Sequence, residues 1–112
     1  MIHRNPDWLK EELVLALDAW FQVKASGDRL SRKHPIVVKL SQTLQELPFH
    51  PKSKKNSEFR SPDGVRRRIG YFAQLDQGKE VYGRHLYQEV WREFKNNPSH
   101  LRIRADEIRN LA

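Results

Sequence analysis

The sequence predicts an all-α fold, a compact bundle of about five short helices with a helix-turn-helix-like core. Apolar residues recur at spacings of three and four along most of the chain, which is the period of an amphipathic helix. Proline and glycine stand near the ends of these segments, where helices start and stop. A chain of 112 residues has the size of one domain, so we expect residues 1–112 to form a single helical unit.

The first two predicted helices are bounded by glycine and proline. The first runs from about residue 7 to residue 24 and stops near Gly27. Its apolar face holds Leu9, Leu13, Leu17, Trp20 and Phe21. The second lies between Pro35 and Pro48, because proline is tolerated at a helix start but not in a helix interior. Its inward residues are Val37, Leu40, Leu44 and Leu47.

The third predicted helix, over residues 62–75, has the clearest start signal. Ser61 is a good N-cap, Pro62 suits the first helical position, and Asp63 lies in the first turn, where the helix dipole favours a negative charge. The apolar stripe behind this start is Val65, Ile69 and Phe72. The opposite face then presents arginine, glycine, tyrosine and glutamine, which suits the surface of a nucleic acid.

Two more helices are expected after a loop over residues 76–83, within which residues 80–82 could pair as a short strand. The fourth helix spans about 86–95 and ends at the Asn96-Asn97-Pro98 break, and Asn97 or Ser99 can cap the fifth. The expected inward residues are Leu86, Val90, Trp91 and Phe94 in the fourth helix, and Leu101, Ala105, Ile108 and Leu111 in the fifth.

The aromatic residues of these stripes are predicted to belong to the core. They are Trp8, Trp20, Phe21, Trp91 and Phe94. A pocket for a flipped, modified base would use the same residue types, so that interpretation stays open beside core packing.

Positive charge is concentrated in one part of the chain. The net charge is +7 and the pI is about 10.0, which favours a polyanionic partner. Residues 50–72 carry seven lysines and arginines but only two acidic residues, whereas acidic residues outnumber basic ones over residues 7–24. A basic stretch kept only for solubility is the alternative, but it leaves an arginine-faced helix unexplained.

Other function classes find little support in the composition. The chain has no cysteine, no apolar run of about 20 residues and no N-terminal signal-peptide pattern, so we expect a cytoplasmic protein that does not bind membranes. Its five histidines have no zinc-ligand spacing, and neither an HNH core nor a glycine-rich nucleotide loop is present. Glu58, Asp63 and Asp76 lack the strands that would hold a nuclease metal. We therefore expect no catalytic residue, metal or cofactor here.

The residues predicted to contact nucleic acid lie on the third helix and in the connection before it. They are Lys52, Lys54, Lys55, Arg60, Ser61, Gly64, Arg66, Arg67, Arg68, Gly70, Tyr71 and Gln74. Arginine can hold a phosphate or read guanine, and lysines in the connection would follow the sugar–phosphate backbone.

Four of these residues have a structural alternative. Arg68 could pack its stem over the core edge, and Tyr71 could pack against a neighbouring helix. Gly64 could serve the turn rather than a phosphate. Gly70 is costly inside a helix, so either a phosphate or another helix should approach it closely.

Several of these segments together resemble a known family. They are Trp8, residues 12–18, His34-Pro35, the Phe-Arg-x-Pro-x-Gly-Val segment at residues 59–65, Arg68-Ile69, Phe72, Leu75-Asp76 and residues 90–94. The chain resembles the N-terminal domain that precedes HNH nuclease domains in bacterial restriction-type endonucleases, including modification-dependent, type IV-like enzymes. The resemblance implies a DNA-recognition module but supplies no base code. Because some relatives attack DNA with modified bases, sensing of modified cytosine such as 5-methylcytosine is one possibility for this chain. The chain departs from the family at Leu9, where Ser or Thr is common, and at Tyr71, where Asn is common.

The sequence therefore predicts a module that binds double-stranded DNA. A protein-interaction domain with a basic face for an acidic partner is the alternative, and RNA binding is a third hypothesis. A homodimer is left open.

Overall fold

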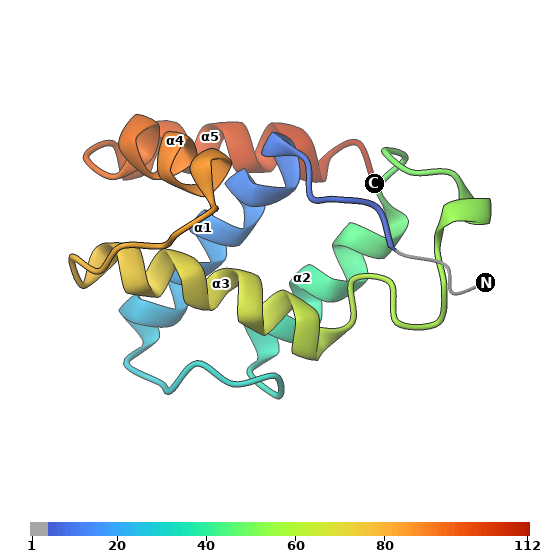
Figure 1. The fold of residues 1–112 in the computed structure, drawn as a ribbon, viewed down its shortest axis with the longest axis horizontal. Helices are drawn as coiled ribbons and strands as arrows, with labels where there is room; N and C mark the ends of the chain where they lie inside the picture. Colours follow the sequence, from blue (N-terminus) through green and yellow to red (C-terminus); the bar gives the residue numbers. More distant parts are fainter. Residues whose placement is uncertain (1–4) are drawn as a thin grey trace.

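The computed structural model describes residues 5–112 and confirms the all-α prediction (Figure 1). Its helices are α1 (Lys10–Ser26), α2 (Pro35–Glu46), α3 (Pro62–Asp76), α4 (His85–Phe94) and α5 (Pro98–Arg109), with a short 3₁₀ turn at Lys52–Lys54. The described residues contain no strand, and residues 80–82, which could have paired as one, lie in a turn region. No helix within residues 5–112 has the length and apolarity to cross a membrane.

Helix α1 is the centre of the bundle, and each of the other helices packs against it (Figure 1). Every residue from 12 to 19 is buried, so this part of α1 is covered on all sides, whereas residues 24–26 at its end are exposed. Leu13 and Leu17 of the predicted apolar face are fully buried, but burial over residues 12–19 extends around the whole helix and is not limited to one face. Leu9, expected on that face, is 38% exposed and stands in extended backbone before the helix begins.

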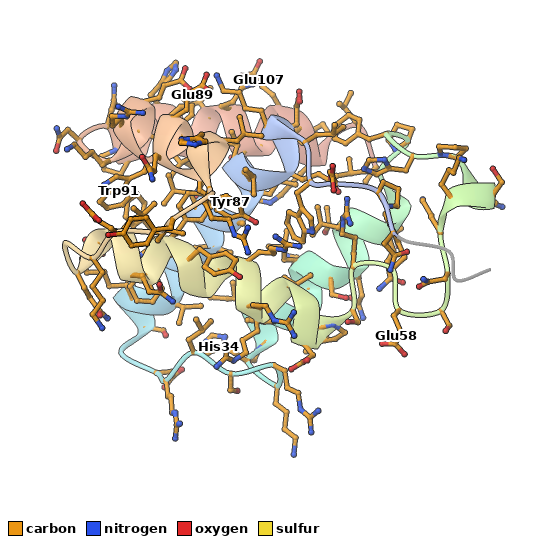
Figure 2. The ribbon with its side chains drawn as sticks, in the orientation of Figure 1. His34, Glu58, Tyr87, Glu89, Trp91 and Glu107 are labelled. Atoms are coloured by element: carbon orange, nitrogen blue, oxygen red, sulfur yellow. The ribbon has the colours of Figure 1, made fainter. Side chains whose placement is uncertain are left out.

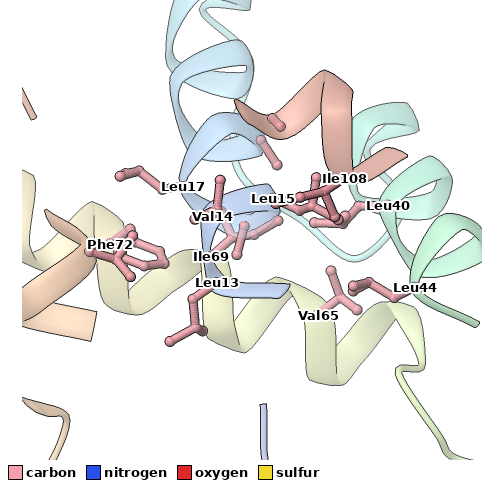
Figure 3. Close-up of a cluster of buried hydrophobic side chains, with 14 of the residues drawn as sticks. Leu13, Val14, Leu15, Leu17, Leu40, Leu44, Val65, Ile69, Phe72 and Ile108 are labelled. Carbon is pink, nitrogen blue, oxygen red and sulfur yellow. The ribbon is translucent and has the colours of Figure 1, made fainter. Parts of the chain in front are cut away.

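Helices α2 and α3 pack against α1 and against each other. Leu44 of α2 lies beside Val65 of α3 in the core that Figure 3 shows, and Leu40 and Ile69 belong to the same cluster. The predicted inward residues of both helices are confirmed, since all are at most 5% exposed. The connection between the two helices covers residues 47–61, far longer than the turn of three to four residues in a standard helix-turn-helix.

Helices α4 and α5 lie together along the upper edge of Figure 1. Buried Asp18 of α1 holds α5 in place, because its carboxylate accepts a hydrogen bond from the Arg109 guanidinium and its Oδ1 lies 3.3 Å from Arg102 Nε. Leu111, expected inside, follows the end of α5 and is 55% exposed.

Candidate nucleic-acid interface

The start of α3 is built as its sequence predicts. The Ser61 Oγ accepts a hydrogen bond from the Gly64 N–H at 3.4 Å, and Pro62 occupies the first helical position. A Cβ on Gly64 would meet only Ser61 Oγ, at 3.5 Å. Both residues therefore serve the helix start in this structure, and the buried stripe of α3 fixes the direction of its outer face.

The outer face of α3 carries Arg66, Arg67, Gly70 and Gln74, and we call it the arginine face. Arg66, Arg67 and Gln74 are exposed, and the one ion pair recorded for Arg67 is a loose 4.0 Å contact with Asp63. A Cβ on Gly70 would touch only the tip of Arg66, at 4.0 Å. No neighbouring helix approaches Gly70, so close helix packing does not explain the glycine.

Arg60 lies inside the protein, contrary to the expectation that it holds DNA. Its side chain is 3% exposed, and its guanidinium donates to both carboxylate oxygens of Glu12 at 2.8 and 2.9 Å. It also donates to the Pro6 carbonyl at 3.0 Å and lies over the rings of Trp8 and Phe59. A guanidinium held in this way links the N-terminal segment to α1 and α3 and is not available to a phosphate.

The backbone of Arg60 is also unusual. With φ of 49°, it is the one residue other than glycine within residues 5–112 that has a positive φ. This conformation costs about 1–2 kcal/mol for an L-residue. The Ser41 hydroxyl donates to the Arg60 carbonyl at 2.6 Å, so bonds on both its side chain and its backbone hold the residue there.

Glu12 is the buried anion that this arginine neutralises. Burial alone raises the pKa of a carboxyl, but hydrogen bonds from Arg60 and His50 outweigh it and hold the pKa of Glu12 below its ordinary value of 4.5. The carboxylate also accepts the Leu9 N–H at 3.0 Å, so it caps α1 without the Ser or Thr common in the resembled family. Glu12 therefore both caps α1 and neutralises the buried Arg60.

A second cluster joins α3 to the start of α4. Arg68, half-buried, donates to the Tyr87 hydroxyl at 2.9 Å, and Arg84 donates to the Tyr71 hydroxyl at 3.1 Å. The hydrogen bond from Arg84 lowers the pKa of the Tyr71 phenol. The two tyrosine rings meet edge to face with centroids 5.3 Å apart. Both Arg68 and Tyr71 therefore have the packing role that the sequence left open for them.

Sequence reasoning missed Arg84, whose Nε is buried without a hydrogen-bond partner. Its only sequence signal was its position between Gly83 and a helix start.

Of the three lysines predicted to contact DNA, two are exposed and one is bound to the protein. Lys52 and Lys54 are exposed in the 3₁₀ turn, which lies at one end of the molecule beyond the start of α3 (Figure 1). The Lys55 ammonium instead donates to the Gln45 carbonyl at 3.0 Å and lies 5.0 Å from the centre of the Phe59 ring.

Two adjoining hollows form a groove along the seam between the N-terminal segment, α3 and the start of α4. We call it the seam groove, and Figure 2 shows Tyr87 on its α4 side. The hollows have volumes of about 240 and 390 Å³. Both are lined by Asp7, Trp8 and Arg68. The other charged or hydroxyl-bearing residues of the lining are Glu58, Arg60, Ser61, Arg67, Arg84, His85 and Tyr87.

A further basic segment precedes α2. Arg29, Arg32 and Lys33 are exposed in the connection from α1, which lies on the side of α3 away from α4 in Figure 1. Charge counting over residues 50–72 did not include them. The described residues contain no group of three or more acidic, histidine or cysteine side chains placed to hold a metal ion.

Comparison with known proteins finds no relative. No family model matches the chain, and neither a curated protein nor a solved structure matches it.

Proposed function

We propose that this chain is a module that binds double-stranded DNA, of the kind that precedes HNH nuclease domains in restriction-type endonucleases. The observation that carries the proposal is the exposure of Arg66 and Arg67 on a helix whose other side is fixed in the core. A rigid helix with two exposed guanidiniums can present them to phosphates or to guanine edges with little loss of conformational entropy in the backbone. The resemblance of residues 59–72 supports the nuclease context.

In the proposed complex the arginine face meets the duplex. Arg67 belongs to both the arginine face and the lining of the seam groove, so contacts can continue from the helix into the groove. Lys52 and Lys54 extend the positive surface beyond the start of α3. Arg60 supports this surface from inside. Arg68 and Lys55 lie at the surface, and each donates to a protein oxygen, the Tyr87 hydroxyl and the Gln45 carbonyl respectively.

The module would recognise DNA, and the cutting reaction would belong to a nuclease domain outside these residues. A preference for modified cytosine follows from the resemblance alone.

The test is a titration of labelled duplex with wild-type protein and two charge-reversed variants, followed by fluorescence anisotropy. Arg67→Glu changes the arginine face, and Arg104→Glu makes the same charge change on α5, a helix on another side of α1. We expect Arg67→Glu to weaken binding at least tenfold, roughly 1.4 kcal/mol or more, and Arg104→Glu to have a much smaller effect. Duplexes with unmodified, methylated and hydroxymethylated cytosine, and an RNA duplex, define the preferred partner.

Equal losses in the two variants would mean that net charge rather than the arginine face governs binding. Absence of DNA binding at low salt would contradict the proposal and leave the basic face to an acidic protein partner.

A further inference from the structure

A third hollow, of about 330 Å³, lies between the end of α3, the following turn and the outer side of α4. Its walls include the rings of Tyr82 and Trp91 and the side chain of Leu75, with Lys79 and Arg92 also in the lining. Figure 2 shows Trp91 on the same side of the view as the end of α3. We call this hollow the Tyr82 pocket. Its size is at the lower limit of small-molecule sites.

The exposure of Tyr82 is imposed by the turn that carries it. The neighbouring Val81 is buried, and its carbonyl accepts a hydrogen bond from Gln88 Nε2 at 3.1 Å. Gly78 and Gly83 turn the chain on either side with φ of 80° and 69°. The backbone is thus anchored while the Tyr82 ring remains 84% exposed. A large ring held in water contributes nothing to the core, so packing does not account for it.

Trp91 gives this pocket a fixed aromatic wall. It is half-buried and packs on Phe21 at a centroid distance of 6.2 Å. Trp8 differs, because its ring already carries the guanidiniums of Arg60 and Arg68 at 4.8 and 5.9 Å. Of the aromatic residues that the sequence left as candidates for a base pocket, Trp91 thus stands beside a second ring that is open to solvent.

The charged residues around these rings are two cations, Lys79 and Arg92, and one anion, Glu80. Lys79 and Arg92 are both exposed. The Arg92 guanidinium donates one hydrogen bond, to the Gln88 carbonyl at 3.3 Å, within residues 5–112. The carboxylate of Glu80 accepts the Tyr82 hydroxyl, which raises the pKa of that phenol. Aromatic surface beside lysine and arginine is the combination that binds an unstacked base and its phosphate.

We propose that the Tyr82 pocket binds an unpaired nucleobase of the DNA, with the ring of Tyr82 stacked on the base and Arg92 or Lys79 near its phosphate. This inference rests on the proposed DNA binding. Arg67 and Leu75 are eight positions apart on α3, about 12 Å along the helix axis. At about 3.4 Å per nucleotide of one strand, this axial separation alone corresponds to about four nucleotides.

The experiment compares two DNA probes, a blunt duplex and the same duplex with one unpaired 2-aminopurine, in the same anisotropy titration. The fluorescence of 2-aminopurine also reports stacking directly. The variants are Tyr82→Ala, Tyr82→Phe, which keeps the ring, and Ile103→Ala as a control on another exposed apolar residue, 61% exposed on α5. The Tyr82 ring is exposed, so Tyr82→Ala should unfold at the same urea concentration as wild type.

We expect wild type to bind the duplex with the unpaired base roughly tenfold more tightly than the blunt duplex, and its 2-aminopurine fluorescence to fall on binding. Tyr82→Ala should lose this preference while keeping its affinity for the blunt duplex. Tyr82→Phe and Ile103→Ala should keep the preference.

Equal binding of the two probes by wild type, or a preference that survives in Tyr82→Ala, would overturn the inference and leave the pocket to another occupant such as an apolar peptide side chain. Binding of the blunt duplex that depends on Arg67 would in that case still support the proposed function. Failure to bind either probe would contradict both.

Discussion

Arg60 and Arg67 belong to the same short basic segment and have opposite surroundings. Arg60 is buried against Glu12 and two aromatic rings, whereas the side chain of Arg67 is 65% exposed. One guanidinium holds three parts of the fold together, and the other is left for solvent or a partner. Arginines that a charge count treats alike can therefore do different work, and the partner that separates them, Glu12, is 48 positions away from Arg60.

Removal of the buried arginine should have the largest effect on stability. Arg60→Ala leaves the Glu12 carboxylate buried without its cation, so we expect the free energy of unfolding to fall by about 3–5 kcal/mol. Arg67→Ala should change it by less than about 0.5 kcal/mol, as is usual for exposed side chains. Urea unfolding followed by circular dichroism measures both. Similar losses in the two variants would mean that Arg60 is not the structural member of the pair.

Low pH should weaken the buried ion pair between Arg60 and Glu12. The pKa of Glu12 is lower in the folded protein than its ordinary value of 4.5, so the unfolded chain binds more protons in the range between the two values. The stability that this carboxylate contributes is fully present above about pH 4.5 and is lost as the pH falls through the folded-state pKa. Urea unfolding between pH 6 and pH 3 should show this loss in wild type.

Glu12→Gln is the control for that pH dependence. The variant should be less stable at neutral pH, because Arg60 then lacks its anion, and its stability should fall less steeply in acid. Equal slopes in the two proteins would assign the acid sensitivity to other groups, of which Asp76 also has a lowered pKa.

Local signals in the sequence were sufficient for most of the fold. The proline at the start of α2 and of α3 predicted those starts correctly, because its fixed φ and missing N–H suit a first helical turn. Pro98 was interpreted only as the break after α4, and of the two caps considered for α5 the structure has Asn97. The start of α1 was misplaced by about three residues, since Trp8 and Leu9 continue the apolar pattern although their backbone is extended. Periodicity also could not show that residues 12–19 of α1 are enclosed on all sides, because that depends on four other helices.

The candidate site was only partly predictable. The exposure of Arg66, Arg67 and Gln74 followed from helical spacing alone. The burial of Arg60 and the bond between Arg84 and Tyr71 depend on contacts between distant segments, so no local pattern predicts them. Whether these residues bind DNA stays a prediction.

A smaller effect should separate the cluster beside the arginine face from the buried pair. Tyr71→Phe removes the hydroxyl that accepts from Arg84 but keeps the ring, so we expect a loss of about 0.5–1.5 kcal/mol in the free energy of unfolding. The same urea experiment measures it. A loss as large as that of Arg60→Ala would place Tyr71 among the essential structural residues.

Gly70→Ala should have the smallest effect on stability, and it tests why a glycine lies on the arginine face. Only the tip of Arg66 is within reach of an added Cβ, and alanine is the better helix former, so we expect a gain of roughly 0.5–1 kcal/mol in stability. If DNA approaches the backbone there, the more stable variant should bind duplex less tightly. A loss of stability would show that Gly70 serves the fold.

The salt dependence of DNA binding by wild type and by the double variant Arg66→Ala/Arg67→Ala shows whether the arginine face holds phosphates. Each phosphate contact contributes about 0.9 to the slope of log affinity against log salt concentration. If both arginines hold phosphates, the double variant should lose about two units of slope while its urea unfolding stays close to that of wild type. An unchanged slope, or an affinity of wild type that does not depend on salt, would contradict the assignment of the arginine face as the DNA-binding surface.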